Sequence, residues 1–274
     1  MNPKTTSRYA KTLVILGGLL IGSVFVAAAQ PSPAPTPPPA VPQVSASPAG
    51  GISPLAEKLL TQTCQTLGSA DAFSFHAEVM FDRVLPAAVK VQFAGALNFA
   101  LQRPSELAID YRSDLGAKQL WYQNNTLTIF DPPHAMYATL PVPDSIDGML
   151  EQVGRDNHLT PPLSELAYRD PCQPIRKQII YGDYIGANDV DGIACDHVAF
   201  SSRTTDLQLW LELTGKRLPR KIVINHRSEP GAPEYIAFLS DWMFPKDIAA
   251  SEFTAQLPKD AKKIEFLKIT EKQP

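Results

Sequence analysis

Polar and apolar residues alternate with a period of two along much of this chain, and this pattern restricts its fold more than any other feature. The pattern is clearest in residues 206–213, where leucine occupies every second position. Successive side chains of a β-strand point to opposite faces, so this segment is predicted to be a strand with one apolar and one mixed face. The residues expected to share the mixed face and to form cross-strand pairs are Gln208, Trp210 and Glu212.

A β-hairpin is predicted directly before this strand. Its arms are residues 178–185 and 193–201, and a polar turn at 187–192 joins them. Period-two runs predict further strands at 73–82, 89–101, 107–112, 118–122, 126–130, 136–140, 220–227, 234–244 and 263–267. Gly95 lies inside a long run and is a natural position for a bend or bulge. The chain is therefore expected to form a meander of antiparallel strands.

Residues 53–68 give the clearest helical signal. Ser53 can cap the first turn, Pro54 fits the first helical position, and Gly68 stands where the helix is expected to stop. Apolar residues recur on one stripe of this segment, so the helix must pack against another part of the chain.

A proline-rich insertion at 132–174 interrupts the strands, with short helices predicted at 145–153 and 163–168. Such an insertion is a candidate lid or plug. A curved sheet cannot leave an apolar face in water, because burial is worth roughly 25 cal/mol per Å². The three predicted helices are the covering material visible in the sequence, and they leave room for an apolar groove.

The residues predicted to line such a groove and to bind a ligand lie on the apolar faces of the strands. They are Phe73, Phe75, Phe93, Leu97, Phe99, Ile109, Tyr111, Trp121, Leu207, Leu209 and Leu211. The alternative is that these residues only form a closed core, because most apolar strand faces pack without any ligand.

Residues 1–29 have the three parts of an export signal. Basic residues open the segment, an apolar core follows at 13–26, and three alanines stand at 27–29. The alternative is an uncleaved membrane anchor, but the apolar core is shorter than the ~18 residues typical of a spanning helix. We therefore expect cleavage near Ala29 and a soluble periplasmic protein. No cysteine follows the core, which argues against attachment of a lipid.

The segment 30–51 is dense in proline and alanine and is expected to be a disordered, extended linker, with recognition of a partner as the alternative. The remaining residues, 52–274, have a length that suits one β-rich domain. The formal net charge of −3 and the pI of about 6.0 argue against nucleic acid as a partner.

No arrangement of residues typical of an active site is found in the sequence. It contains no GxSxG, GxGxxG or phosphate-binding loop, and no cysteine or histidine spacing typical of a metal site. Asp196 and His197 are neighbours on a predicted strand, so their side chains should point to opposite faces and cannot form a dyad. His197 is expected to be a structural hydrogen-bonding residue. The sequence therefore predicts neither an enzyme nor a cofactor.

The chain has three cysteines, and an oxidising compartment favours one disulfide. Cys172 and Cys195 are closest in sequence and are the predicted pair. The alternative is that these cysteines are buried free thiols, which pack as small hydrophobic residues.

A resemblance to a known family adds to these inferences. The residues that carry it are Tyr184, Gly186, Val190, Gly192, Cys195, His197, Ala199, Phe200, Gln208, Trp210, Glu212, Pro219 and Lys221. With them, residues 54–267 resemble a bacterial family of predicted periplasmic proteins of unassigned function, related to the LolA/LolB-like outer-membrane lipoprotein carriers. The family usually has an aromatic residue at the position of Leu207 and leucine at that of Val198, and both replacements remain apolar.

The resemblance implies a mainly β (α+β) fold, an open curved antiparallel half-barrel whose concave face is covered by short helices. It also implies an apolar cavity that can hold acyl chains. The first hypothesis is therefore a monomeric periplasmic binder or carrier of a lipid or an acylated protein. The alternative is an envelope protein-interaction or sensor module with a helix-filled core. A hydrolase is a third hypothesis, for which His197 is the best candidate base.

Overall fold

The structure is a computed structural model, and it describes residues 51–266. The predicted export signal and nearly all of the predicted linker lie outside the described residues. Within the described part of the chain, no helix is long and apolar enough to cross a membrane.

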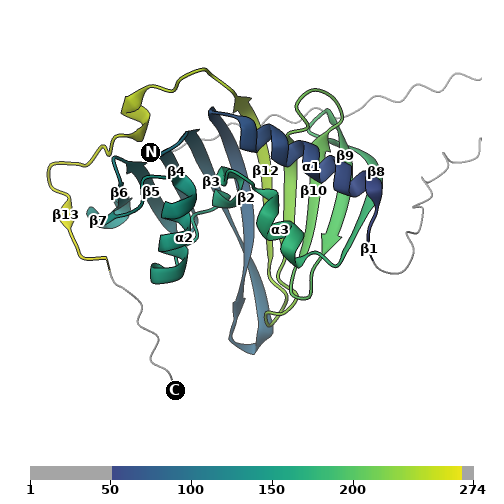
Figure 1. Cartoon of the computed structure of the whole chain (residues 1–274). Coiled ribbons are helices and arrows are strands. Elements are labelled where there is room, and N and C mark those ends of the chain that lie inside the picture. Colours follow the sequence, from purple (N-terminus) through teal and green to yellow (C-terminus); the bar gives the residue numbers. More distant parts are fainter. Residues whose placement is uncertain (1–50, 267–274) are drawn as a thin grey trace, which may run out of the picture. The chain divides into compact units, whose positions relative to one another are not determined.

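The described residues form one large sheet that curves without closing (Figure 1). The strands are β1 (Gly51–Ile52), β2 (Ala72–Leu85), β3 (Val89–Gln102), β4 (Glu106–Ser113), β5 (Gly116–Gln123), β6 (Thr126–Asp131), β7 (Met136–Pro141), β8 (Tyr181–Val190), β9 (Ile193–Ser201), β10 (Asp206–Glu212), β11 (Pro219–Asn225), β12 (Glu234–Met243) and β13 (Lys262–Lys263). Their order across the sheet is β1-β8-β9-β10-β11-β12-β2-β3-β4-β5-β6-β7-β13.

Neighbouring strands are antiparallel, except that the two short edge strands pair in parallel, β1 with β8 and β13 with β7. The meander between β2 and β7 and the meander between β8 and β12 meet where β12 pairs with β2. The helices are α1 (Pro54–Ser69), α2 (Ile146–Asn157) and α3 (Cys172–Gln178), and the 3-10 turns are η1 (Pro86–Ala88), η2 (Pro132–His134), η3 (Ser164–Ala167) and η4 (Ala250–Phe253). The predicted half-barrel with helices on one face is confirmed.

All three helices lie on the concave face of the sheet (Figure 1). Ser53 and Ser145 cap α1 and α2, because their hydroxyls accept hydrogen bonds from the amides of Ala56 and Gly148. The apolar sides of both helices join the strands in one core. At its centre, Phe75 stacks on Phe99 with ring centroids 4.7 Å apart, and each such buried ring contributes about 1.5–3 kcal/mol.

The helix α3 was not predicted. The sequence predicts a strand from 178, but residues 172–178 form α3 and the strand begins at Tyr181. The hairpin is also longer than predicted, since β8 extends to Val190 and only Asp191 and Gly192 remain in the turn. Both turn residues have positive φ, 50° and 78°, as the tight turn of a hairpin requires.

The two glycines singled out in the sequence serve close packing. Helix α1 continues through Gly68 to Ser69, and a Cβ atom at residue 68 would lie 2.4 Å from the carbonyl oxygen of Arg169. At Gly95 the β2–β3 register runs on without a bulge. A Cβ atom at residue 95 would lie 2.6 Å from the carbonyl oxygen of Arg112. Both positions require glycine because another segment passes directly beside them.

The predicted disulfide is wrong. Cys172 of α3 bonds Cys64 of α1, with their Cα atoms 5.7 Å apart, and Cys195 is a buried free thiol. Cys195 pairs across strands with Glu212 and lies on the convex face, opposite to Val198, which packs in the concave core. The sheet therefore separates Cys195 from Cys172, whereas both α1 and α3 lie on the concave side.

We expect the double substitution Cys64→Ser/Cys172→Ser to lower the free energy of unfolding by about 4–5 kcal/mol, because the crosslink closes a long loop. The sequence separation of the pair is 108 residues. Urea denaturation of the oxidised protein measures the loss, and Cys195→Ala, which keeps the crosslink, is the control. Unchanged stability of the double variant, or a peptide that links Cys172 to Cys195, would contradict this assignment.

Substitution of Gly68 by alanine should destabilise the protein by about 1–3 kcal/mol, because the added methyl group overpacks the contact with Arg169. The control is Gly154→Ala in α2, where an added Cβ meets nothing within 4 Å and helix propensity favours alanine by about 0.5–1 kcal/mol. Thermal unfolding of both variants measures the difference. Equal melting temperatures for the two variants would show that the contact at Gly68 does not constrain the fold.

Candidate functional site

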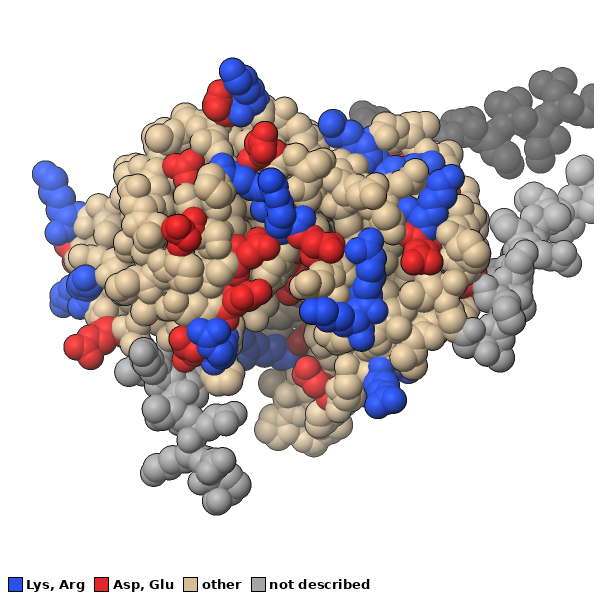
Figure 2. Space-filling model, viewed as in Figure 1, with Lys and Arg blue, Asp and Glu red and all other residues tan. Residues whose placement is uncertain are grey.

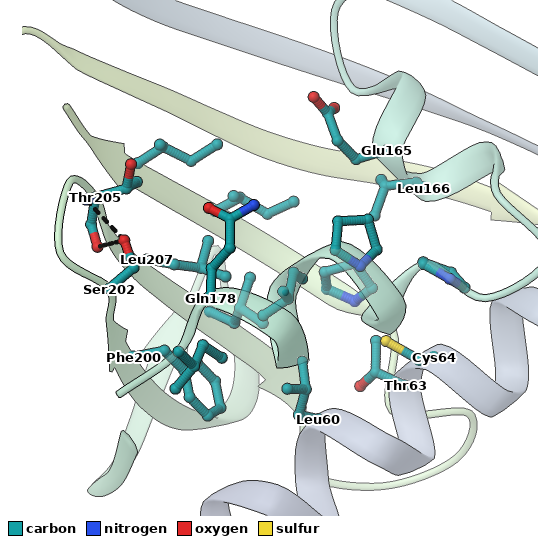
Figure 3. Close-up of a pocket in the computed structure, with 18 of the residues that line it drawn as sticks. Leu60, Thr63, Cys64, Glu165, Leu166, Gln178, Phe200, Ser202, Thr205 and Leu207 are labelled. Atoms are coloured by element: carbon teal, nitrogen blue, oxygen red, sulfur yellow. Dashed lines mark hydrogen bonds between the residues drawn. The ribbon is translucent and has the colours of Figure 1, made fainter. Parts of the chain in front are cut away.

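A cavity of about 320 Å³ lies between the concave face of β9 to β11 and a roof made by α1, η3 and α3. Figure 3 shows Leu60 of α1, Phe200 of β9 and Leu207 of β10 around it. Cavities that bind small ligands commonly have volumes of roughly 300–1,000 Å³, so this one suits a single small ligand.

The floor of the cavity follows from the alternation in β10 and β11. Leu207 is the cross-strand partner of Ile224, and Leu209 is the partner of Ile222. All four side chains line the cavity. The period-two pattern that predicts the strand thus also supplies an apolar floor.

The roof consists of apolar residues from three separate segments. Leu60 and Leu67 come from α1, Leu166 comes from η3, and Ile175 comes from α3. The disulfide joins α1 to α3 within this roof, and Cys64 is itself a lining residue. The crosslink therefore fixes the distance between two walls of the cavity.

Arg103, in the turn after β3, forms a second link between the segments that make the roof. Its guanidinium donates hydrogen bonds to the carbonyl oxygens of Ala70 at 3.1 Å, Ala167 at 2.9 Å and Tyr168 at 3.1 Å. Burial, and then the charge of Arg169, lowers the pKa of Arg103. One side chain thus ties the end of α1 to η3.

Several lining residues are polar. The hydroxyl of Ser202 donates to the carbonyl oxygen of Thr205 and accepts from its amide, so these groups satisfy each other in a turn (Figure 3). Gln178 and His226 also line the cavity, and Glu165 of η3 contributes a carboxylate. Although Glu165 is exposed at its surface, the surrounding protein desolvates its carboxylate and raises its pKa. The cavity is therefore apolar, with one carboxylate in its lining.

Among the residues predicted to line a groove, Leu207 and Leu209 line this cavity. Most of the others are buried in the closed part of the core, namely Phe73, Phe75, Leu97, Phe99, Ile109 and Leu211. They are covered there because Met149, Leu150 and Val153 of α2 and the apolar side of α1 belong to the same core. Most of the predicted set therefore lies within the buried core and outside the lining of this cavity.

The remaining members of the predicted set lie elsewhere. Tyr111 packs half-buried against the core, and Phe93 stacks on Phe81 with ring centroids 5.9 Å apart. Trp121 lies on the convex face, opposite to Leu120 and Tyr122, which belong to the concave core. The turn η4 contacts β4 and β5, the strand that carries Trp121.

The roof residues and Glu165 are not among the residues that the sequence predicts to line a groove. The apolar stripe of α1 is readable from the sequence and could have suggested Leu60 and Leu67. Leu166, Ile175 and Glu165 come from the proline-rich insertion, which carries no periodic signal that shows which residues turn inward.

The mixed face of β10 forms the cross-strand pairs that the sequence predicts. The ring of His197 stacks on Trp210 with centroids 3.9 Å apart, and its Nε2 atom lies 3.1 Å from Oε1 of Gln208. Lys221 lies over Trp210 at 4.6 Å. Burial lowers the pKa of His197, and the hydrogen bond to Gln208 opposes this shift. His197 is thus a structural residue of the convex face.

Asp196 points to the other face, as predicted. Its carboxylate accepts a hydrogen bond from the Tyr184 hydroxyl at 3.0 Å and forms an ion pair with Arg217. Asp196 and His197 therefore do not form a dyad. Within residues 51–266, no group of three or more histidine, cysteine, aspartate or glutamate side chains could hold a metal ion.

Three solved structures are similar to the chain over most of its length. An uncharacterized conserved protein from Thermus thermophilus has 8% sequence identity and a TM-score of 0.45, and the match covers 77% of this chain and 99% of that protein. The lipoprotein LppX of Mycobacterium tuberculosis has 11% identity and a TM-score of 0.40, with 71% and 98% covered. A LolA superfamily protein of Nitrosomonas europaea has 10% identity and a TM-score of 0.38, with 73% and 97% covered.

No curated protein matches the chain. A family model matches residues 56–267, which include the whole sheet from β2 to β13 and the roof of the cavity from Ala56 onward. The family's description agrees with the periplasmic location expected from the N-terminal sequence. By this match the chain belongs to the family described as predicted periplasmic protein (DUF2092).

Proposed function

We propose that this protein is a non-catalytic periplasmic binder or carrier, which holds an acyl chain of a lipid or of an acylated protein in the cavity between α1, α3 and β9 to β11. The observation that carries the proposal is the apolar lining of that cavity, which lies beside a core of buried side chains. The sequence resemblance to lipoprotein carriers leads to the same expectation.

The energetics of the cavity favour a hydrocarbon occupant. Each CH₂ group that leaves water contributes about 0.8 kcal/mol, so a chain of a dozen carbons could contribute up to about 9 kcal/mol. Association and ordering of the chain remove part of this gain. The cavity volume of about 320 Å³ fits one chain better than several. An affinity in the micromolar range is therefore the physical expectation.

A second candidate function is an envelope protein-interaction or sensor module without a small ligand. The observation that favours it is the burial of Phe73, Phe75 and Phe99, because helices already fill the concavity above them. In that case the cavity under α3 is only a packing defect, and a partner protein meets another surface.

Native mass spectrometry of the exported protein separates the two candidates. A carrier should retain apolar molecules of one chemical class through gentle purification, and these should be released by organic extraction. A protein that is free of ligand, and that takes up no added acyl compound, would exclude the carrier function and favour the interaction module.

Leu207→Trp should weaken the binding of a dodecyl chain by at least tenfold, because the larger ring occupies the floor of the cavity. The matched control is Leu213→Trp, since Leu213 is exposed just after β10 and lies outside the cavity lining. Displacement of a neutral fluorescent apolar probe from ligand-free protein measures both variants. Equal affinities for Leu207→Trp and the unmodified protein would place the binding site elsewhere.

A further inference from the structure

The hairpin of β2 and β3 projects beyond the strands on either side of it. Pairing with β4 reaches only to Gly95 of β3, and pairing with β12 reaches only to Phe81 of β2, so residues 82–94 extend past the sheet (Figure 1). The tip of this hairpin, residues 84–89, carries apolar residues alone. Leu85 and Val89 are 46% and 53% exposed there. Exposed apolar side chains that lie together commonly mark an interaction site.

Other turns lie at the same end of the sheet as this tip, because successive strands run in opposite directions. We define the turn end as residues 83–90, 114–115, 179–181, 202–205 and 226–233. Its loops adjoin one another, since the amide of Ser228 donates a hydrogen bond to the carbonyl oxygen of Thr204 at 3.2 Å and Gly231 lies directly beside Val84. Leu115 and Ile180 add further exposed apolar side chains. The turn end therefore presents apolar side chains from three separate connections.

The apolar cavity reaches the turn end. Ser202, Thr205 and His226 line the cavity and belong to this end, and the lining residue Gln178 lies directly before it in the chain. Figure 3 shows Ser202 and Thr205 on one side of the cavity and Cys64 of the roof on the other. A surface that meets the turn end therefore lies next to the cavity.

The charges of the turn end are close to balanced, and Figure 2 shows basic and acidic side chains interspersed on the helix-covered face. Arg83 and Lys90 stand on either side of the apolar tip, and Lys90 pairs with Asp82 at 2.9 Å. Arg227 pairs with Asp206 at 3.1 Å. The remaining charged residues of this end are Arg203, Asp114 and Glu229. No strong field of either sign results, so the apolar side chains determine what this surface attracts.

We propose that the turn end docks on the surface of a phospholipid bilayer, with Leu85 and Val89 of the hairpin tip inserted among the lipid tails. This inference goes beyond the proposed function, because docking does not require a bound chain. Where the cavity holds a chain, the bilayer is its source or its destination.

The form of the tip favours a bilayer over a protein as the partner. A fluid bilayer accepts a single projecting hairpin without a matching shape, and each apolar side chain that enters it leaves water. A specific protein interface buries about 800 Å² on each partner, which needs a broader surface than one tip. Arg83 and Lys90, which flank the tip, can reach the lipid phosphates while their apolar stems lie along the lipid.

Sedimentation of the exported protein with vesicles of phosphatidylethanolamine and phosphatidylglycerol measures docking. We expect Leu85→Asp to lower the ratio of bound to free protein by about tenfold, because a charge would have to enter the apolar layer. The matched control is Met243→Asp, since Met243 is an exposed apolar residue at the opposite end of β12. This control should stay within about twofold of the unmodified protein, and added salt should change the ratio equally little.

A second pair of variants tests insertion without adding a charge. Lipids that carry bromine on their tails should quench the fluorescence that Val89→Trp adds at the tip, and should leave the fluorescence that Met243→Trp adds unchanged.

Three results would overturn the inference. They are failure of the unmodified protein to sediment with vesicles, equal losses for Leu85→Asp and Met243→Asp, and absence of quenching for Val89→Trp. A dimer that Leu85→Asp abolishes, found without vesicle binding, would also overturn it and would assign the tip to a second copy of the chain. The proposed function is decided separately, by uptake of an acyl chain in the absence of vesicles.

Discussion

The apolar face of an open sheet must be shielded from water. In this structure, the way in which the helices shield that face determines where the core and the cavity lie. Antiparallel strands with a period-two pattern leave a continuous apolar concavity. Three helices cover it, and the core that they form with the strands provides most of the stabilisation. The disulfide joins α1 to α3, and the hydrogen bonds of Arg103 join the end of α1 to η3.

The helices cover the two halves of the concave face differently, and the candidate site lies in the half that they fill less completely. Over β2 to β5, helix α2 and the phenylalanines of the strands form a closed core. Over β9 to β11, the short helix α3 and the turn η3 make a roof that leaves a cavity above the leucines of β10. Side chains therefore close one half of the concavity, and the other half keeps an apolar space. A hydrocarbon chain could fill this space and so leave water.

The sequence predicts the local parts of this arrangement and misses the non-local ones. The strands, the serine cap of α1, and the expectation that His197 is a structural hydrogen-bonding residue depend on neighbours in the chain or on strand alternation, which are readable. The pairing of Cys64 with Cys172 depends on which face of the sheet each segment occupies. The position of the cavity depends on how far α1 and α2 extend over the sheet. Neither leaves a signal in sequence spacing, so the predicted disulfide is wrong and Phe73 and Phe99 lie in closed core instead of in the cavity lining.

The most direct measurement is a crystal structure of the ligand-free protein soaked with a dodecyl chain that carries bromine at its end, with the anomalous signal of bromine used to locate it. We expect one bromine peak between α1, α3 and the Leu207–Leu209 segment of β10, with the roof helices in place. A bromine peak on the convex face, or a fully occupied chain outside this cavity, would contradict the claim that the uneven covering of the sheet makes the binding site.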